Sequence, residues 1–105
     1  KLIAENPDLI NRFLTASRQG WEDYLNNDPQ PAFDLIQQLN PDMPSDKLAY
    51  AHSKMIEYNI VTGNGEKIGS MSADRWKEFY EMSVELGIYE SEFDHEKAYT
   101  LEFSN

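Results

Sequence analysis

The feature that most constrains the fold is a stretch near the C-terminal end, residues 72–88, which carries the signals of one complete helix. Ser72 and Asp74 can each accept a hydrogen bond from the free N–H groups of a first helical turn. Gly87 follows the last periodic residue, where a left-handed residue commonly ends a helix. One face of the helix carries Trp76, Phe79, Tyr80, Ser83 and Leu86. Such a face needs a partner, so we predict that this helix organises a core and has no catalytic role.

The same helical periodicity recurs upstream and predicts three more helices, separated by short breaks that contain proline. Asn6 and Pro7 begin the first, over residues 7–26, because Asn caps well and Pro is tolerated in a first turn. Asp28-Pro29 begins a second helix that ends at residue 39. Ser45 is predicted to cap a third helix and Asp94 a last, short one. Short connections favour antiparallel neighbours.

The apolar stripes of these helices define the predicted core. Its upstream members are Ile10, Phe13, Leu14, Ser17, Trp21, Tyr24, Leu25, Ala32, Leu35, Ile36, Leu39, Leu48, Ala51, His52, Met55, Ile56 and Tyr58. Between residues 59 and 70 the pattern changes, because Ile60-Val61-Thr62 is β-branched and Gly63-Asn64-Gly65 is a tight-turn signal. A short hairpin and an ordered loop are both open there. We predict an all-α chain of four to five amphipathic helices, a single helical segment over residues 1–105.

Charge and composition exclude several classes of function. The chain has 19 Asp and Glu against nine Lys and Arg, a net charge of −10, which argues against nucleic acid and anionic membranes as partners. It has no cysteine, so disulfides, thiolate nucleophiles and zinc–thiolate sites are excluded. The chain starts at Lys1 without a signal-peptide pattern, and we expect it to be a piece of a longer protein.

The titratable residues predict no catalytic site, metal site or cofactor. His52 lies on the inward face of its helix without an acid at helical spacing, which favours a partly buried structural histidine. His95 is predicted to be exposed. Glu78, Glu81 and Glu85 share a polar helix face, which is typical of a solvated surface. Ser70 and Ser72 have no base near them in the sequence, and Gly63-Asn64-Gly65 lacks the lysine and helix of a phosphate loop.

Trp21 and Trp76 are the two residues best suited to stack on a flat heterocycle. Each also fits the apolar stripe of its helix, so a place in the core is the favoured interpretation.

Four short motifs, in order along nearly the whole chain, resemble one protein family. They are Glu5-Asn6-Pro7-Asp8-Leu9 leading to Arg12-Phe13-Leu14 and Gly20-Trp21; Asn26-Asn27-Asp28-Pro29 through Ala32; Gly69-Ser70-Met71-Ser72-Ala73-Asp74-Arg75-Trp76; and Asp94 with Ala98-Tyr99-Thr100-Leu101-Glu102-Phe103. Together they resemble the C-terminal third of solute-binding proteins of ABC transporters. The group is the one whose members bind nitrate, sulfonates, taurine or thiamine-pyrimidine precursors.

The resemblance implies a parent protein with two α/β lobes of the periplasmic-binding type, which close on a small solute. The sheets and most cleft residues of that fold lie upstream of this segment, so ligand-binding residues stay unknown here. The motif residues are interpreted as structural: Pro7, Gly20, Trp21, Arg75, Trp76, Tyr99 and Phe103. The resemblance also implies a non-enzymatic protein, periplasmic or anchored outside the cell as a lipoprotein. Its partners would be the permease of an ABC importer and the solute.

Two other functions and one form of assembly remain open. The chain could be a stand-alone acidic helical interaction domain. It could also be part of a pyrimidine-synthesis enzyme from a related fungal branch, whose distinguishing histidine and cysteines would lie outside this stretch. Apolar residues at both ends, Leu2, Ile3, Tyr99, Leu101 and Phe103, would face water in an isolated segment. We therefore expect the chain to form a homodimer.

Overall fold

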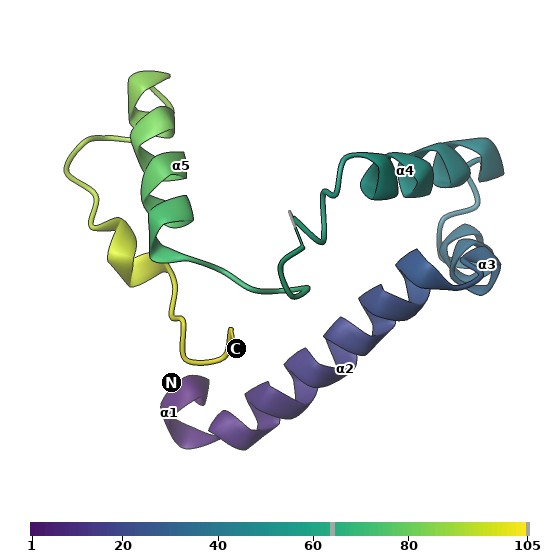
Figure 1. Ribbon diagram of the computed structural model, residues 1–105, viewed down its shortest axis with the longest axis horizontal. Helices are drawn as coiled ribbons and strands as arrows, with labels where there is room; N and C mark the ends of the chain where they lie inside the picture. The colour runs from purple at the N-terminus through teal and green to yellow at the C-terminus, as the bar shows by residue number, and fades with distance from the viewer. Residues whose placement is uncertain (64, 105) are drawn as a thin grey trace. The chain divides into compact units, whose positions relative to one another are not determined.

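The computed structural model describes residues 1–63 and 65–104, and within them every regular element is helical (Figure 1). The elements are α1 (Leu2–Glu5), α2 (Pro7–Asn26), α3 (Gln30–Leu39), α4 (Ser45–Glu57), α5 (Ala73–Glu85) and the 3-10 helix η1 (His95–Ala98). The predicted all-α class is confirmed, although the short helix α1 was not predicted. The described part of residues 59–70 forms turns and no hairpin; Asn64 lies outside the described residues.

The chain divides into two compact units. The first unit spans Lys1–Gly69 and the second spans Ser70–Asn105. No described helix in either unit combines the length and the apolar character that crossing a bilayer requires.

Two of the predicted helix starts are confirmed by their capping hydrogen bonds. The Leu9 N–H donates to the side-chain oxygen of Asn6 at 3.1 Å, directly before the proline at the start of α2. At α5 the Arg75 N–H donates to the Ser72 hydroxyl at 3.2 Å, so Ser72, and not Asp74, is the cap. Each bond satisfies one of the free N–H groups of a first turn.

The other two predicted caps are wrong. Ser45 is the first helical residue of α4, and its hydroxyl instead accepts a hydrogen bond from the Gln37 side chain at 2.9 Å. This contact ties α3 to the first residue of α4. Asp94 makes no side-chain capping bond at η1 and pairs with Lys97 at 3.2 Å. In both cases another polar group competes for the side chain.

The end of α5 is a Schellman motif built around Gly87. Gly87 has φ 72°, a left-handed conformation that suits a residue without a Cβ. The Gly87 N–H donates to the Val84 carbonyl at 3.0 Å, and the Ile88 N–H donates to the Ser83 carbonyl at 2.8 Å. These are the two bonds of the motif, and they confirm the predicted helix end.

The end of α4 has the same geometry around Asn59, which has φ 50°. The Asn59 N–H donates to the Ile56 carbonyl at 3.3 Å, and the Ile60 N–H donates to the Met55 carbonyl at 3.0 Å. Asn is the usual second choice at this position. The motif turns the chain out of α4 into the described turns of residues 59–63, and the sequence reasoning did not identify it.

The first unit closes a small core where α2, α3 and α4 meet. The Tyr24 ring contacts the Phe33 ring edge-on at 6.1 Å and the His52 ring edge-on at 4.8 Å. His52 Nε2 lies 2.7 Å from the Tyr24 carbonyl oxygen, which confirms a partly buried structural histidine. Among the residues described in this unit, the buried hydrophobic ones are Phe33, Leu48 and Ile68. In Figure 1, α3 is seen almost end-on beside α2 and α4, so the helices turn corners and are not antiparallel neighbours as predicted.

The second unit is held together by ring stacking. Trp76 in α5 stacks on Tyr99, with ring centroids 4.9 Å apart and planes 8° apart. Tyr80 in α5 stacks on His95 in η1 at 4.8 Å and 14°. Among the residues described in this unit, the buried ones are Ser83 and Ser104, and none is hydrophobic. The α5 face is therefore contacted along one side by η1 and the C-terminal segment, and otherwise stays open.

Candidate functional site

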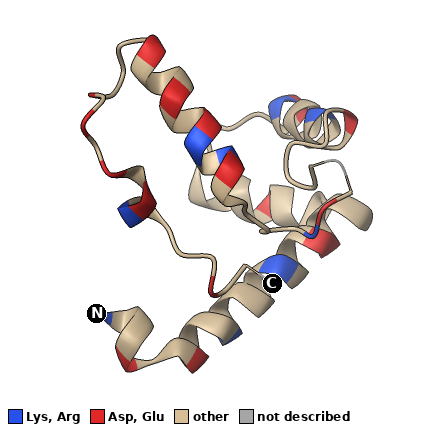
Figure 2. Cartoon of the chain, turned by 60° about the vertical axis from the view of Figure 1, so that its left-hand side comes forward, with Lys and Arg blue, Asp and Glu red and all other residues tan. Residues whose placement is uncertain are grey.

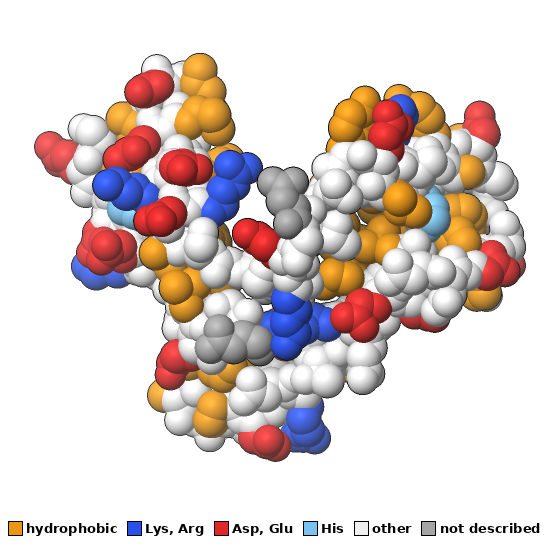
Figure 3. All heavy atoms as spheres, in the orientation of Figure 1, with side chains coloured by type: hydrophobic (Ala, Val, Ile, Leu, Met, Phe, Trp, Pro, Cys, Tyr) orange, Lys and Arg blue, Asp and Glu red, His pale blue; other side chains and the backbone are white. Residues whose placement is uncertain are grey.

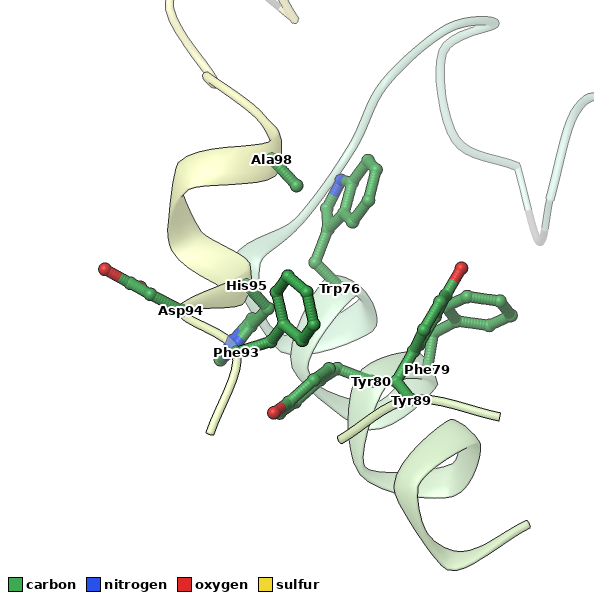
Figure 4. Close-up of a pocket in the computed structure, with 8 residues that line it drawn as sticks. All are labelled: Trp76, Phe79, Tyr80, Tyr89, Phe93, Asp94, His95 and Ala98. Carbon is green, nitrogen blue, oxygen red and sulfur yellow. The ribbon is translucent and has the colours of Figure 1, made fainter. Parts of the chain in front are cut away.

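Both units contain a concave surface lined largely by aromatic and other apolar side chains. The more enclosed of the two is a pocket of about 210 Å³ in the second unit (Figure 4). We call it the aromatic pocket. Its lining residues are Trp76, Phe79, Tyr80, Tyr89, Phe93, Asp94, His95 and Ala98.

The sequence of α5 places three of these rings together. Trp76, Phe79 and Tyr80 are spaced i, i+3 and i+4, which puts them on one face of a helix. The left-handed turn after α5 reverses the chain, and the Tyr89 N–H donates to the Ser83 carbonyl at 3.3 Å. This turn brings Tyr89 back beside the aromatic face. Phe93, Asp94, His95 and Ala98 enter from η1 and the segment before it, as Figure 4 shows.

Two walls of the aromatic pocket are fixed by contacts within the unit. Trp76 is held by stacking on Tyr99, and Tyr80 by stacking on His95. The Tyr80 hydroxyl also donates to the Glu90 carbonyl at 2.8 Å. The prediction that His95 is exposed is wrong: its ring is half-buried because it covers Tyr80. The position of His95 in the first turn of a short helix did not indicate that its ring would stack on Tyr80.

The remaining rings of the aromatic pocket are much more open. The exposed fraction is 50% for Phe79, 49% for Tyr89 and 64% for Phe93. An aromatic side chain contributes 150–250 Å² when it is buried, so these three rings retain a large apolar area for further contact. The open side of the pocket is therefore lined by exposed aromatic rings.

The surroundings of the aromatic pocket are strongly acidic. The second unit has nine Asp and Glu side chains and three Lys and Arg, a net charge of −6. Figure 2 shows the acidic residues along α5 and the chain that follows it. Several are exposed and loosely paired: Glu78 lies 3.8 Å from Arg75, and Glu81 lies 3.8 Å from Lys77. These pairs confirm the predicted solvated polar face, and the excess of negative charge disfavours anions.

The second concave surface is a shallow groove of about 520 Å³ in the first unit. It is lined by Ser17, Gly20, Trp21, Tyr24, Ala32, Ile36, Leu48, Ala51 and Met55. Trp21 meets Tyr24 edge-on at 5.9 Å and is 41% exposed. Burial raises the pKa of the Tyr24 phenol above its usual value of 10.0. The two tryptophans singled out in the sequence thus lie on different concave surfaces.

The described residues offer no cluster of three or more His, Asp or Glu side chains that could hold a metal ion. The two histidines belong to different units, and each is engaged with a tyrosine.

Many apolar side chains that were predicted to be buried are exposed instead. α2 contains no buried residue, and Phe13 is 69% exposed. The chain exposes 8391 Å², whereas a compact protein of 12.2 kDa exposes about 6,100 Å² and two separate compact bodies of these lengths about 7,200 Å². Figure 3 shows the hydrophobic side chains that reach the surface in both units. The stripes are present, but the described chain has too few layers to cover them.

Sequence reasoning did not identify Tyr89 or Phe93 as site residues. A signal was available in the distribution of aromatic residues. Residues 70–105 make up a third of the chain but contain seven of its 13 Phe, Trp and Tyr. Such enrichment exceeds what one amphipathic helix needs, and indicates an aromatic surface.

The comparisons with known proteins give one informative likeness. No protein-family model matches the chain, and no solved structure matches it. The chain is similar to a protein named riboflavin-binding protein RibY from Chloroflexus aurantiacus, with 31% identity over 107 residues. The alignment covers 97% of this chain and 30% of that protein. The chain therefore spans less than a third of the length of the relative that it matches.

Proposed function

We propose that this chain is a segment of a solute-binding protein that captures a small planar heterocycle outside the cell and delivers it to an ABC importer. The observation that carries the proposal is the likeness to a riboflavin-binding protein along 97% of the chain. The four motifs that resemble solute-binding proteins of ABC transporters support the same function independently. The proposed protein is non-enzymatic and works by closing two lobes on its solute.

The exposed apolar faces support the view that further polypeptide covers this segment in the whole protein. A contiguous apolar patch of more than a few hundred Å² is rare on a soluble monomer. The relative is more than three times as long as the aligned region, so it has chain available to cover such faces. In the proposed protein, this segment is its C-terminal part and packs against a lobe.

For the solute, a flavin is the first choice and a thiamine pyrimidine precursor the second. Both are planar and aromatic, and the relative's name refers to riboflavin. Nitrate and sulfonates are less favoured because the second unit carries a net charge of −6, which repels anions. The partners that follow are the solute and the importer's permease, and the location is the periplasm or the outer surface of the membrane.

Fluorescence titration of the whole protein that contains this segment tests the proposal. Riboflavin loses fluorescence when its ring stacks on aromatic side chains, so we expect saturable quenching at about micromolar protein or below. A thiamine pyrimidine precursor, taurine and nitrate are tested as competitors. Binding of the pyrimidine by calorimetry, without any quenching of riboflavin, would transfer the proposal to that solute. Failure of both riboflavin and the pyrimidine to bind would contradict it, whether or not taurine or nitrate binds.

A further inference from the structure

We propose that the aromatic pocket of the second unit is a stacking site for the planar ring of the solute, so that this segment itself contributes to solute binding. The inference rests on the proposed function and goes beyond it by naming residues. It assigns the contact to Phe79, Tyr89 and Phe93, the three open rings of the aromatic pocket. Trp76 and Tyr80 form its supporting walls.

The first argument is preorganisation. The stacked pairs Trp76–Tyr99 and Tyr80–His95 fix two rings before any ligand arrives. Side chains that are already ordered lose little further entropy on binding. The open rings of Phe79 and Phe93, both labelled in Figure 4, are then surfaces that a ligand can cover.

The second argument is size. The aromatic pocket measures about 210 Å³, whereas pockets that enclose a whole drug-sized ligand measure about 300–1,000 Å³. It therefore suits one planar ring system and leaves a polar tail outside. Lumiflavin, which is the flavin ring without a sugar-alcohol tail, is the matching probe.

The third argument is chemistry. Base–aromatic stacking tolerates many planar heterocycles because each has a π-face. Tyr89 and His95 carry polar groups in the lining that can hydrogen-bond to the edge of a ring, whereas the Asp94 carboxylate pairs with Lys97. The surrounding negative charge selects a neutral ring over an anion.

The experiment compares two phenylalanine variants in the 105-residue chain. Phe93→Ala removes an open ring of the aromatic pocket, and Phe13→Ala removes an equally open ring in the first unit; the exposed fractions are 64% and 69%. Lumiflavin is titrated against each, with fluorescence quenching as the readout and circular dichroism as the check on folding. Because removing one stacking ring weakens binding about 5- to 150-fold, we expect at least about a fivefold loss for Phe93→Ala. Phe13→Ala should change affinity less than about twofold, and Phe93→Tyr should restore it.

Two outcomes in the 105-residue chain would overturn the inference. One is a folded chain that does not quench lumiflavin, and the other is an equal loss in both alanine variants. A second experiment, with Phe93→Ala in the whole protein and riboflavin as the ligand, then distinguishes failure of this inference from failure of the proposed function. Unchanged riboflavin affinity, with or without a lower melting temperature, means that other polypeptide covers the pocket; the inference is then wrong and the proposed function stands. Absence of riboflavin and pyrimidine binding to the unsubstituted whole protein removes the proposed function.

Discussion

The two units of this chain differ in how much of their apolar surface they bury. In the first unit, helices α2, α3 and α4 bring Tyr24, Phe33 and His52 into mutual contact, and a few apolar side chains are buried around them. In the second unit, α5 has only a 3-10 turn and irregular chain to pack against. Its described buried residues are two serines. Three helices can enclose a small core, whereas one helix and a strap of chain leave an aromatic face open.

This difference shows that an amphipathic sequence predicts an apolar helix face, but does not show whether another part of the chain covers that face. The faces of α2 and α5 are both apolar by sequence, yet Phe13 and Phe79 are largely exposed. Because these side chains are exposed, the helix faces that carry them can serve as an interface or a binding surface. We therefore expect the second unit to depend on further contacts more than the first.

The largest expected effect is self-association driven by the open face of the second unit. We expect a dimer with a dissociation constant of about 10 µM in physiological salt, equivalent to about 7 kcal/mol at the 1 M standard state. The net charge of −10 should weaken pairing at low salt. Light scattering behind a sizing column measures the mass. Phe79→Glu should yield the 12.2 kDa monomer, whereas Phe13→Glu should still dimerise; the reverse result would assign pairing to the first unit.

The next effect concerns the core of the first unit. Phe33 is only 6% exposed, so Phe33→Ala should lower the free energy of unfolding by about 3–4 kcal/mol, as for other buried aromatic truncations. Urea unfolding followed by circular dichroism measures the loss. A change below about 1 kcal/mol would show that the first unit has no more of a core than the second.

A smaller loss is expected from the matching truncation in the second unit. Trp76 is half-buried and stacked on Tyr99, so Trp76→Ala should cost about 2 kcal/mol from partial burial and ring stacking. The exposed Glu81, on the opposite face, serves as the control, and Glu81→Ala should change stability by less than about 0.5 kcal/mol. If Trp76→Ala proves as costly as Phe33→Ala, the comparison between the units fails.

The smallest effect is a pH dependence confined to the first unit. Burial raises the pKa of Tyr24 above 10.0, so the folded state holds the phenolic proton more tightly than the unfolded state. The associated stability is present below pH 10.0 and is lost as the pH rises through the raised pKa. The fall in melting temperature between about pH 9 and about pH 11 should be smaller in Tyr24→Phe than in the unsubstituted chain. Equal falls would place the alkaline sensitivity elsewhere.

Local signals in the sequence were sufficient for helices α2 to α5, although they did not indicate α1. Asn6, Ser72 and Gly87 mark helix ends through hydrogen bonds that involve only neighbouring residues, and such bonds can be inferred from residue type and spacing. The same local reasoning could have identified Asn59. It failed at Ser45, because the Gln37 side chain competes for that hydroxyl.

The sequence by itself determined the all-α class, the main helix boundaries, the apolar stripes and the acidic surface, because each depends on residues a few positions apart. Only the tertiary structure decided which stripe became a core and which became the aromatic pocket. Trp76 stacks on Tyr99, and Tyr80 stacks on His95. Both contacts join different elements, so they depend on how the chain turns after Gly87. Whether an apolar helix face is buried depends on which other elements pack against it. The helical period of the sequence carries no information about those elements.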